Sequence, residues 1–234
     1  MATKKKGGMA IESMTLDFLI SPFKTAYIIF LIFLILIVSN VGLQFFLYQT
    51  SDVAIETIEA AIGREYSFLI FFSGDTFATT LLSNIQTAFH FVFFKMTGFE
   101  MLMQTKPEEL NSFNQMAQKY LFNHYDTMRL LNSSKNLISL RLSFIASASA
   151  LAFLLQVVAI GDGLACRAIR RACAGRESSG NYHYAKWWRL GIISLSMSIY
   201  LVCPFFIHPA LLALPIVTSA VLTQIQFKFW KKYL

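Results

Sequence analysis

The chain has 234 residues, of which 56% are hydrophobic and 14% are charged, and its mean hydropathy is +0.54. These values lie outside the usage of ordinary soluble proteins and predict an all-α integral membrane protein without a large soluble catalytic domain. The net charge of +7 does not by itself indicate nucleic-acid binding. Cations beside membrane spans serve orientation and contact with anionic lipid first.

Three uncharged apolar segments predict four membrane spans. Residues 25–48 are long enough to cross about 30 Å of hydrocarbon and follow a basic tail, residues 1–24, so we interpret them as an uncleaved signal anchor. Residues 142–161 form a second span, rich in the serine and alanine that permit close helix contact. Residues 190–227 are too long for one span and predict two helices in a hairpin that reverses at Cys203–Pro209.

Lysine and arginine predict the orientation of these spans. They are concentrated in the tail 1–24, in a loop at 162–189 and in the segment 228–234, whereas residues 49–141 are net acidic. Because cytoplasmic loops carry the excess of cations, we expect the three basic segments in the cytoplasm and residues 49–141 on the exported side. The predicted fold therefore has about four transmembrane helices, both termini inside, and an exported helical region between the first and second spans.

The exported region is expected to consist of helices. Asp52–Gly63 has isoleucines at helical spacing, and Pro107 is expected to open a helix over Glu108–Leu131. Thr76–Phe94 is uncharged, but a crossing there would place the basic loop outside, so we interpret it as an amphipathic helix that packs on other exported helices or lies in the membrane interface. Arg141, at the exported edge of the second span, is expected to be an interfacial anchor.

The sequence offers little for metal, covalent or proton chemistry. The cysteines Cys166, Cys173 and Cys203 lack the spacing of a zinc site and are expected to be free reduced thiols, so we expect no metal and no cofactor. The four predicted spans contain no acidic residue, which argues against proton-coupled transport.

The segment from Gly161 to Lys186 holds the densest group of polar residues. Asp162 is expected to cap a short helix over Leu164–Cys173, on which three arginines at i, i+3 and i+4 share one face. The candidate partner- or lipid-binding residues are Arg167, Arg170, Arg171, Arg176 and Lys186. The candidate loop-structuring residues are Gly161, Asp162, Gly163, Gly175, Glu177, Ser178, Tyr182 and His183. We assign no catalytic residue, because a serine and a histidine on an exposed loop lack a pocket that excludes water.

The order of these residues resembles a known family. The segment is similar to the signature of integrating conjugative element and conjugative plasmid membrane proteins, a family defined by a domain of unknown function, in the run Gly161, Asp162, Gly163, Leu164, Arg167, Arg170, Arg171, Gly175, Arg176, Glu177, Ser178, Tyr182, His183, Ala185 and Lys186. The length and the layout of spans also resemble that family. The chain departs from the pattern at Ala168, where an acidic residue is common, and at Asn181, where an aromatic residue is common.

The resemblance implies an inner-membrane component of bacterial conjugation, in elements that encode a type IV secretion apparatus and a coupling ATPase. We therefore expect a non-enzymatic subunit of a conjugative DNA transfer system, whose basic loop docks a partner such as the coupling ATPase or binds anionic lipid. Its expected partners are membrane lipids, other conjugation membrane proteins and further copies of itself, and direct nucleic-acid contact is not expected. The alternative is a small oligomeric transporter or pore formed by the four spans.

Overall fold

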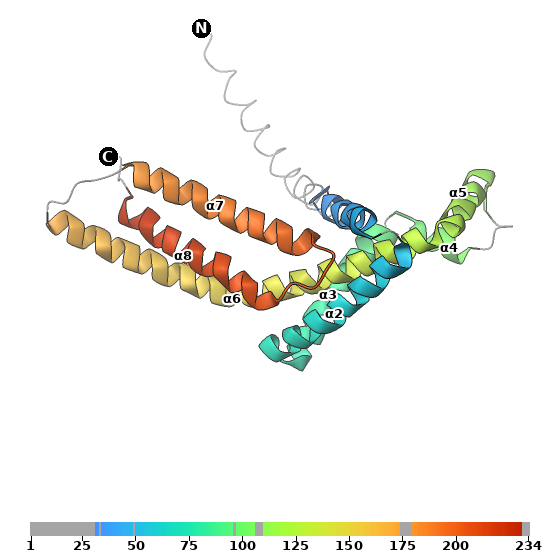
Figure 1. The fold of residues 1–234 in the computed structure, drawn as a ribbon, viewed down its shortest axis with the longest axis horizontal. Coiled ribbons are helices and arrows are strands. Elements are labelled where there is room, and N and C mark those ends of the chain that lie inside the picture. The colour runs from blue at the N-terminus through green and yellow to red at the C-terminus, as the bar shows by residue number, and fades with distance from the viewer. Residues whose placement is uncertain are drawn as a thin grey trace, which may run out of the picture.

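The computed structural model describes residues 31–32, 34–48, 50–95, 97–105, 110–173 and 179–230. Within these ranges the chain forms helices and no strand, in agreement with the predicted all-α class (Figure 1). The predicted basic tail 1–24 and residues 231–234 lie outside the described residues. Of the predicted first span, 25–48, the described part forms the helix Leu34–Leu47.

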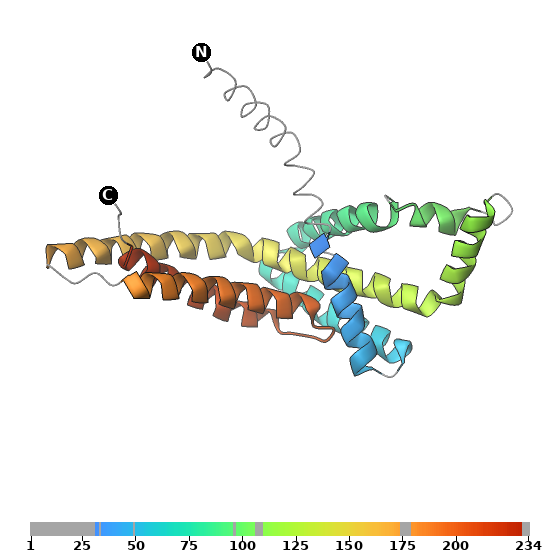
Figure 2. The same cartoon turned by 90° about the horizontal axis from the view of Figure 1, so that it is seen from above.

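One long helix, α6, organises the fold. It runs from Tyr125 to Ala172 over 48 residues, which corresponds to a length of about 72 Å at 1.5 Å per residue. Figure 2 shows its first half among the helices that precede it in the chain and its second half beside α7 and α8. We call the first group, with Leu34–Leu47, the N-terminal core, and the second group the three-helix bundle.

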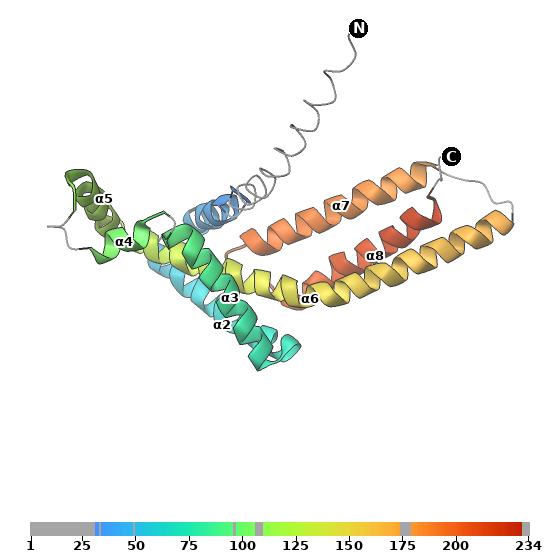
Figure 3. The ribbon, with the colours of Figure 1, turned by 180° about the vertical axis from the view of Figure 1, so that it is seen from behind.

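The three-helix bundle combines the second half of α6 with an antiparallel hairpin. The hairpin consists of α7, Ser179–Val202, and α8, Ala213–Lys228, and the 3-10 helix η3, Pro209–Leu212, precedes α8. The chain reverses between Val202 and Pro209, where the prolines predict the turn. Because α8 contacts both α6 and α7, it lies between them (Figure 3). The buried residues of α8 are mostly small or polar: Pro215, Ser219, Ala220, Thr223 and Gln226.

The N-terminal core packs α2, Ser51–Ser73, and α3, Asp75–His90, against the first half of α6. Ala54, Ile55 and Ile58 of α2 are buried with leucines of α6 because they recur at helical spacing on one face. α3 buries Ala78 and Phe89 and continues into a π-helix, Phe91–Lys95. The predicted amphipathic helix over 76–94 is therefore present and packs on other helices of this core.

The far end of the N-terminal core differs from the prediction. The short helices α4, Phe99–Gln104, and α5, Ser112–Asn123, lie there (Figure 2). A single helix over 108–131 is wrong, because His124 leaves helical geometry at φ −113° and ψ 34° and α6 begins at the next residue. Pro107 itself lies outside the described residues.

A second correction concerns Gly161, Asp162 and Gly163. They were expected to end a span and start a loop, yet they lie inside α6, which continues to Ala172. Asp162 therefore cannot cap a helix that begins at Leu164. The glycines do not end the helix, because a glycine inside a helix costs only about 1 kcal/mol relative to alanine. At Gly163, close packing of α6 on α8 offsets this cost.

Two described helices have the length and hydropathy of a membrane span. They are Tyr125–Ala172, which contains the predicted span 142–161, and Pro209–Lys228, which contains the predicted fourth span, and Leu34–Leu47 is a shorter apolar helix. In the most apolar window of Tyr125–Ala172 only 11% of the residues are buried inside the molecule. Most of these apolar side chains thus face outward.

Candidate functional site

The largest fully buried side chain in the described structure is that of Arg141, in the first half of α6. Its side chain is 0% exposed and forms a bidentate ion pair with Glu65 of α2, which is 2% exposed. The distance from Nη2 to Oε1 is 2.6 Å, and that from Nε to Oε2 is 3.0 Å. The expectation that Arg141 is an exposed interfacial anchor is therefore wrong.

Arg141 also binds the end of α7 and the turn that follows it. Nη1 donates to the carbonyl of Tyr200 at 2.6 Å and to that of Cys203, and Nη2 donates to the carbonyl of Phe205 at 2.7 Å. The last carbonyls of a helix have no partner within the helix, so this cation satisfies acceptors that would otherwise be left unpaired. The backbone N–H of Ile207 in turn donates to Glu65 at 3.3 Å.

This arrangement joins three segments that are far apart in the sequence: α2, α6 and the α7–α8 turn. We call Glu65, Arg141 and the carbonyls that Arg141 binds the buried ion-pair site. A guanidinium has five N–H donors in a fixed fork, which suits simultaneous binding of a carboxylate and several carbonyls. The site fixes the position of the hairpin relative to the N-terminal core, which is a structural role.

Sequence reasoning missed Glu65, although a signal was present. Glu65 lies on the same face of α2 as the buried Ile58, Ala61 and Leu69, because these residues follow one another at intervals of three and four. A carboxylate on a buried apolar stripe requires a cation or several hydrogen-bond donors. The sequence pattern thus identifies an acid that needs a partner but does not say which cation it is.

The helix Leu34–Leu47 adds a second set of buried polar contacts to the same region. Asn40 donates from Nδ2 to the carbonyl of Val202 at 2.7 Å, and Gln44 donates from Nε2 to the hydroxyl of Ser134 at 3.0 Å. Both side chains are 0% exposed. The end of α7 is therefore held by two different helices of the N-terminal core.

A polar network lies within the three-helix bundle. Gln156 of α6 donates to the hydroxyl of Ser219 at 2.8 Å and accepts from the hydroxyl of Thr223 at 2.6 Å. Arg189 of α7 donates to the same Thr223 hydroxyl at 3.2 Å. One threonine of α8 therefore connects α6 and α7. Asp162 continues the contacts by accepting from the side-chain amide of Gln224.

We expect Thr223→Val to lower the free energy of unfolding by about 0.5–1.5 kcal/mol, because it leaves half-buried partners on α6 and α7 without their hydrogen bond. The matched control is Thr218→Val on the exposed side of α8, where the hydroxyl bonds only the carbonyl of Leu214. The control is expected to change stability by less than about 0.5 kcal/mol. Thermal unfolding in detergent measures both, and equal effects would show that the network does not stabilise the bundle.

The structure divides the predicted cationic residues into three groups. Arg167 and Arg170 are half-buried and lie over the rings of Trp230 and Phe229, with the guanidinium carbon 5.8 Å and 4.6 Å from the ring centroids. Arg171 and Lys186 are exposed. Arg176 lies outside the described residues, together with Gly175, Glu177 and Ser178.

The α6–α7 connection is thus much shorter than the predicted loop 162–189. Tyr182 and His183, which were expected to structure that loop, lie in the first turns of α7 with their rings 5.3 Å apart. The basic residues Arg167, Arg170, Arg171 and Lys186 nevertheless lie at one end of the three-helix bundle, where α6 ends and α7 begins. We call this region the basic end.

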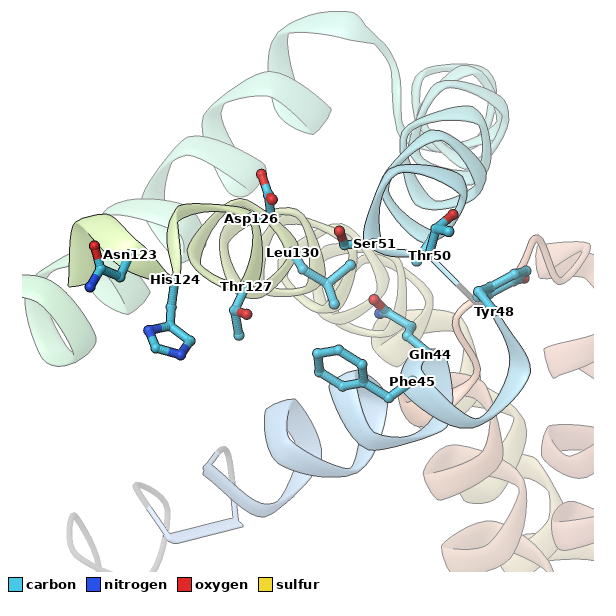
Figure 4. A pocket seen from close by; sticks show the side chains of 11 residues that line it. Gln44, Phe45, Tyr48, Thr50, Ser51, Asn123, His124, Asp126, Thr127 and Leu130 are labelled. Atoms are coloured by element: carbon cyan, nitrogen blue, oxygen red, sulfur yellow. The ribbon is translucent and has the colours of Figure 1, made fainter. Parts of the chain in front are cut away.

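A small cavity of about 240 Å³ lies in the N-terminal core, away from the basic end. It is lined by the helix Leu34–Leu47 and by the first turns of α2 and α6, and Figure 4 shows Gln44 and Phe45 facing Thr127 and Leu130 across it. Within the described residues, no group of three or more histidine, cysteine, aspartate or glutamate side chains is placed to hold a metal ion. The three cysteines have free thiols.

Comparison with known proteins identifies a family. The DtrJ-like family, described as IncC plasmid conjugative DNA transfer protein DtrJ-like, matches residues 54–228. The matched region extends from α2 to the last residue of α8, so it includes the buried ion-pair site and the basic end. No curated protein and no solved structure gives a significant match.

Proposed function

Because the chain belongs to the DtrJ-like family of conjugative DNA transfer proteins, we propose that it is a non-enzymatic, multi-pass subunit of the bacterial inner membrane that works with a type IV secretion apparatus. The family match supports the role in conjugative DNA transfer. The membrane location and the mode of action are inferred from the exposed surfaces of the described helices.

The outward surface of the three-helix bundle supports a membrane location. Large apolar side chains are exposed on each of its three helices: Leu151, Phe153, Leu154, Val158, Leu195, Ile199, Leu214 and Val217. Exposed apolar surface of this extent is unusual for a soluble protein and is expected where helices contact lipid. We infer that this part of α6, with α7 and α8, crosses the bilayer.

The two ends of the bundle support the predicted orientation. The basic end also contains Trp187, Trp188 and Trp230, all exposed, and tryptophan is enriched where a membrane meets water. The buried ion-pair site lies at the opposite end, beside the α7–α8 turn. By the positive-inside bias we assign the basic end to the cytoplasm and the N-terminal core to the exported side.

The observation that carries the proposed mode of action is the separation of these two ends. At the basic end, Arg167 and Arg170 rest on aromatic rings, while Arg171 and Lys186 are exposed toward the surroundings. Two cations that rest on aromatic rings beside two exposed cations would complement an acidic surface on a cytoplasmic partner. We propose that the basic end docks such a partner, with the coupling ATPase as the first candidate.

The test is co-purification of the intact protein from cells during conjugation, comparing Arg171→Ala/Lys186→Ala with the control Lys119→Ala/Arg129→Ala. The control changes two exposed cations at the other end of the molecule. We expect the first variant to insert normally and to lose the coupling ATPase, with at least about a tenfold weaker interaction, which corresponds to about 1.4 kcal/mol.

Unchanged recovery of the coupling ATPase would contradict the docking role. If the variant instead retained the ATPase and lost co-purified anionic phospholipid, the basic end would bind lipid headgroups. A loss shared with the control variant would point to a general effect of charge removal and would equally contradict docking at the basic end.

A further inference from the structure

The connection between α2 and α3 forms an exposed aromatic tip in the N-terminal core. It comprises residues 71–77 and turns at Gly74, whose φ is +80°. Phe71 is 90% exposed and Phe77 is 54% exposed. From Ser67 to Phe94 the sequence has a single formally charged residue, Asp75. We call residues 71–77 the α2–α3 tip.

The direction of α2 determines where this tip lies along α6. Early residues of α2, such as Ile58, are buried with Leu130 and Leu137 of α6, and later residues, such as Leu69, are buried with Leu140 and Phe144. The two helices therefore run in the same direction. Figures 1 and 3 show the end of α2 diverging from α6 instead of following it into the bundle.

The level of the tip can be compared with that of the buried ion-pair site. Glu65 is level with Arg141, and Phe71 follows it by six residues, or about 9 Å along the helix axis. The ring of Phe72 is 5.6 Å from that of Phe144, which lies within the predicted span 142–161. The tip is therefore beside the part of α6 at which the predicted span 142–161 begins.

The surroundings of the tip favour lipid over a protein partner. Its exposed phenylalanines lie beside the start of the predicted span 142–161, and α6 presents large exposed apolar side chains from Leu151 onward. Asp75 is the single formally charged residue from Ser67 to Phe94, so the tip offers little of the charge complementarity that a protein partner would use.

We propose that the α2–α3 tip inserts into the exported leaflet and anchors the N-terminal core to the lipid surface. The proposal rests on the membrane crossing of α6 described above. It assigns to Phe71 and Phe77 a role that packing within the chain does not explain. The tip would thus contact the bilayer beside the spans without crossing the membrane.

The test uses nitroxide spin labels and measures their accessibility to oxygen, which concentrates in lipid, and to a water-soluble nickel complex. Cys166, Cys173 and Cys203 are first replaced by serine, and single cysteines are then introduced as Phe71→Cys, Phe153→Cys and Phe113→Cys in the full chain, reconstituted in liposomes. Phe153 reports on the proposed span, and Phe113, exposed on α5 at the far end of the core, is the aqueous control.

We expect the oxygen-to-nickel accessibility ratio at position 71 to approach that at 153 and to exceed that at 113 severalfold. A ratio at 71 equal to that at 113, with 153 in lipid, would overturn the tip proposal and leave the proposed crossing of α6 intact. Low accessibility to both reagents at 71 would show protein contact and would also overturn it. A label at 153 that is accessible to nickel would refute the membrane crossing and the tip proposal together.

Discussion

Arg141→Met is expected to lower the free energy of unfolding by about 3–5 kcal/mol, because it leaves the buried Glu65 carboxylate without its cation. It also leaves the carbonyls of Tyr200, Cys203 and Phe205 without a donor. The control is Arg129→Met, at an exposed position of the same helix, which should change stability by less than about 0.5 kcal/mol. Unfolding of the purified protein in detergent measures both variants.

The double variant Glu65→Leu/Arg141→Met separates the ion pair from the carbonyl contacts. Because each single change strands the other partner, we expect the double variant to lose less stability than the sum of the two single changes. Arg141→Lys should be intermediate, since an ammonium group cannot reproduce the fork that binds Glu65 and the turn together. Additive single effects, or an Arg141→Met variant as stable as the control, would contradict the assigned role of the pair.

Gly163→Leu is expected to separate α6 from α8 and to abolish the native packing of the three-helix bundle. A Cβ at Gly163 would lie 2.7 Å from the carbonyl oxygen of Gln224 and 2.9 Å from Cβ of Phe227. Overpacking typically costs about 1–3 kcal/mol even when the neighbours can adjust, and here the nearest atoms belong to the backbone and a Cβ. We therefore expect a larger loss for leucine and a loss within that range for Gly163→Ala.

Gly161 provides a matched control for this prediction, because a Cβ there meets nothing within 4 Å. Gly161→Leu and Gly161→Ala should be neutral or should stabilise α6, since both residues have higher helix propensity than glycine. Thermal stability in detergent and the frequency of plasmid transfer give the comparison. Similar effects at the two glycines would indicate that α6 and α8 do not approach closely at Gly163.

Composition and local pattern predict the helices of this protein well, but not where the longest of them ends. The prolines at 204 and 209 locate the α7–α8 turn, because proline restricts the backbone wherever it occurs. Asp162 between two glycines resembles a helix boundary, yet α6 passes through it. Gly163 allows α6 to approach α8 closely. A local sequence pattern cannot distinguish a glycine with this role from one that ends a helix.

The sites were less predictable, because their partners come from distant parts of the chain. The i, i+3 and i+4 spacing predicts three arginines on one helix face, but it does not reveal that aromatic residues about 60 positions later cover Arg167 and Arg170 while Arg171 is exposed. Glu65 and Arg141 are separated by 76 residues. Each is recognisable in the sequence as a charged residue in apolar surroundings, but only the fold shows that they pair with each other.

The continuity of α6 has a mechanical consequence. A helix without a break behaves as a rigid rod, and this one extends from the N-terminal core to the basic end. Arg141 attaches α2 and the α7–α8 turn to the first half of this helix, so a tilt of α6 would pivot about that attachment. At 1.5 Å per residue, Arg141 lies about 24 Å from the start of α6 and about 46 Å from its end, so a tilt of about 10° about Arg141 moves the two ends by about 4 Å and about 8 Å. A force applied to α6 at the basic end would therefore move its other end, in the N-terminal core, in the opposite direction without any intervening hinge.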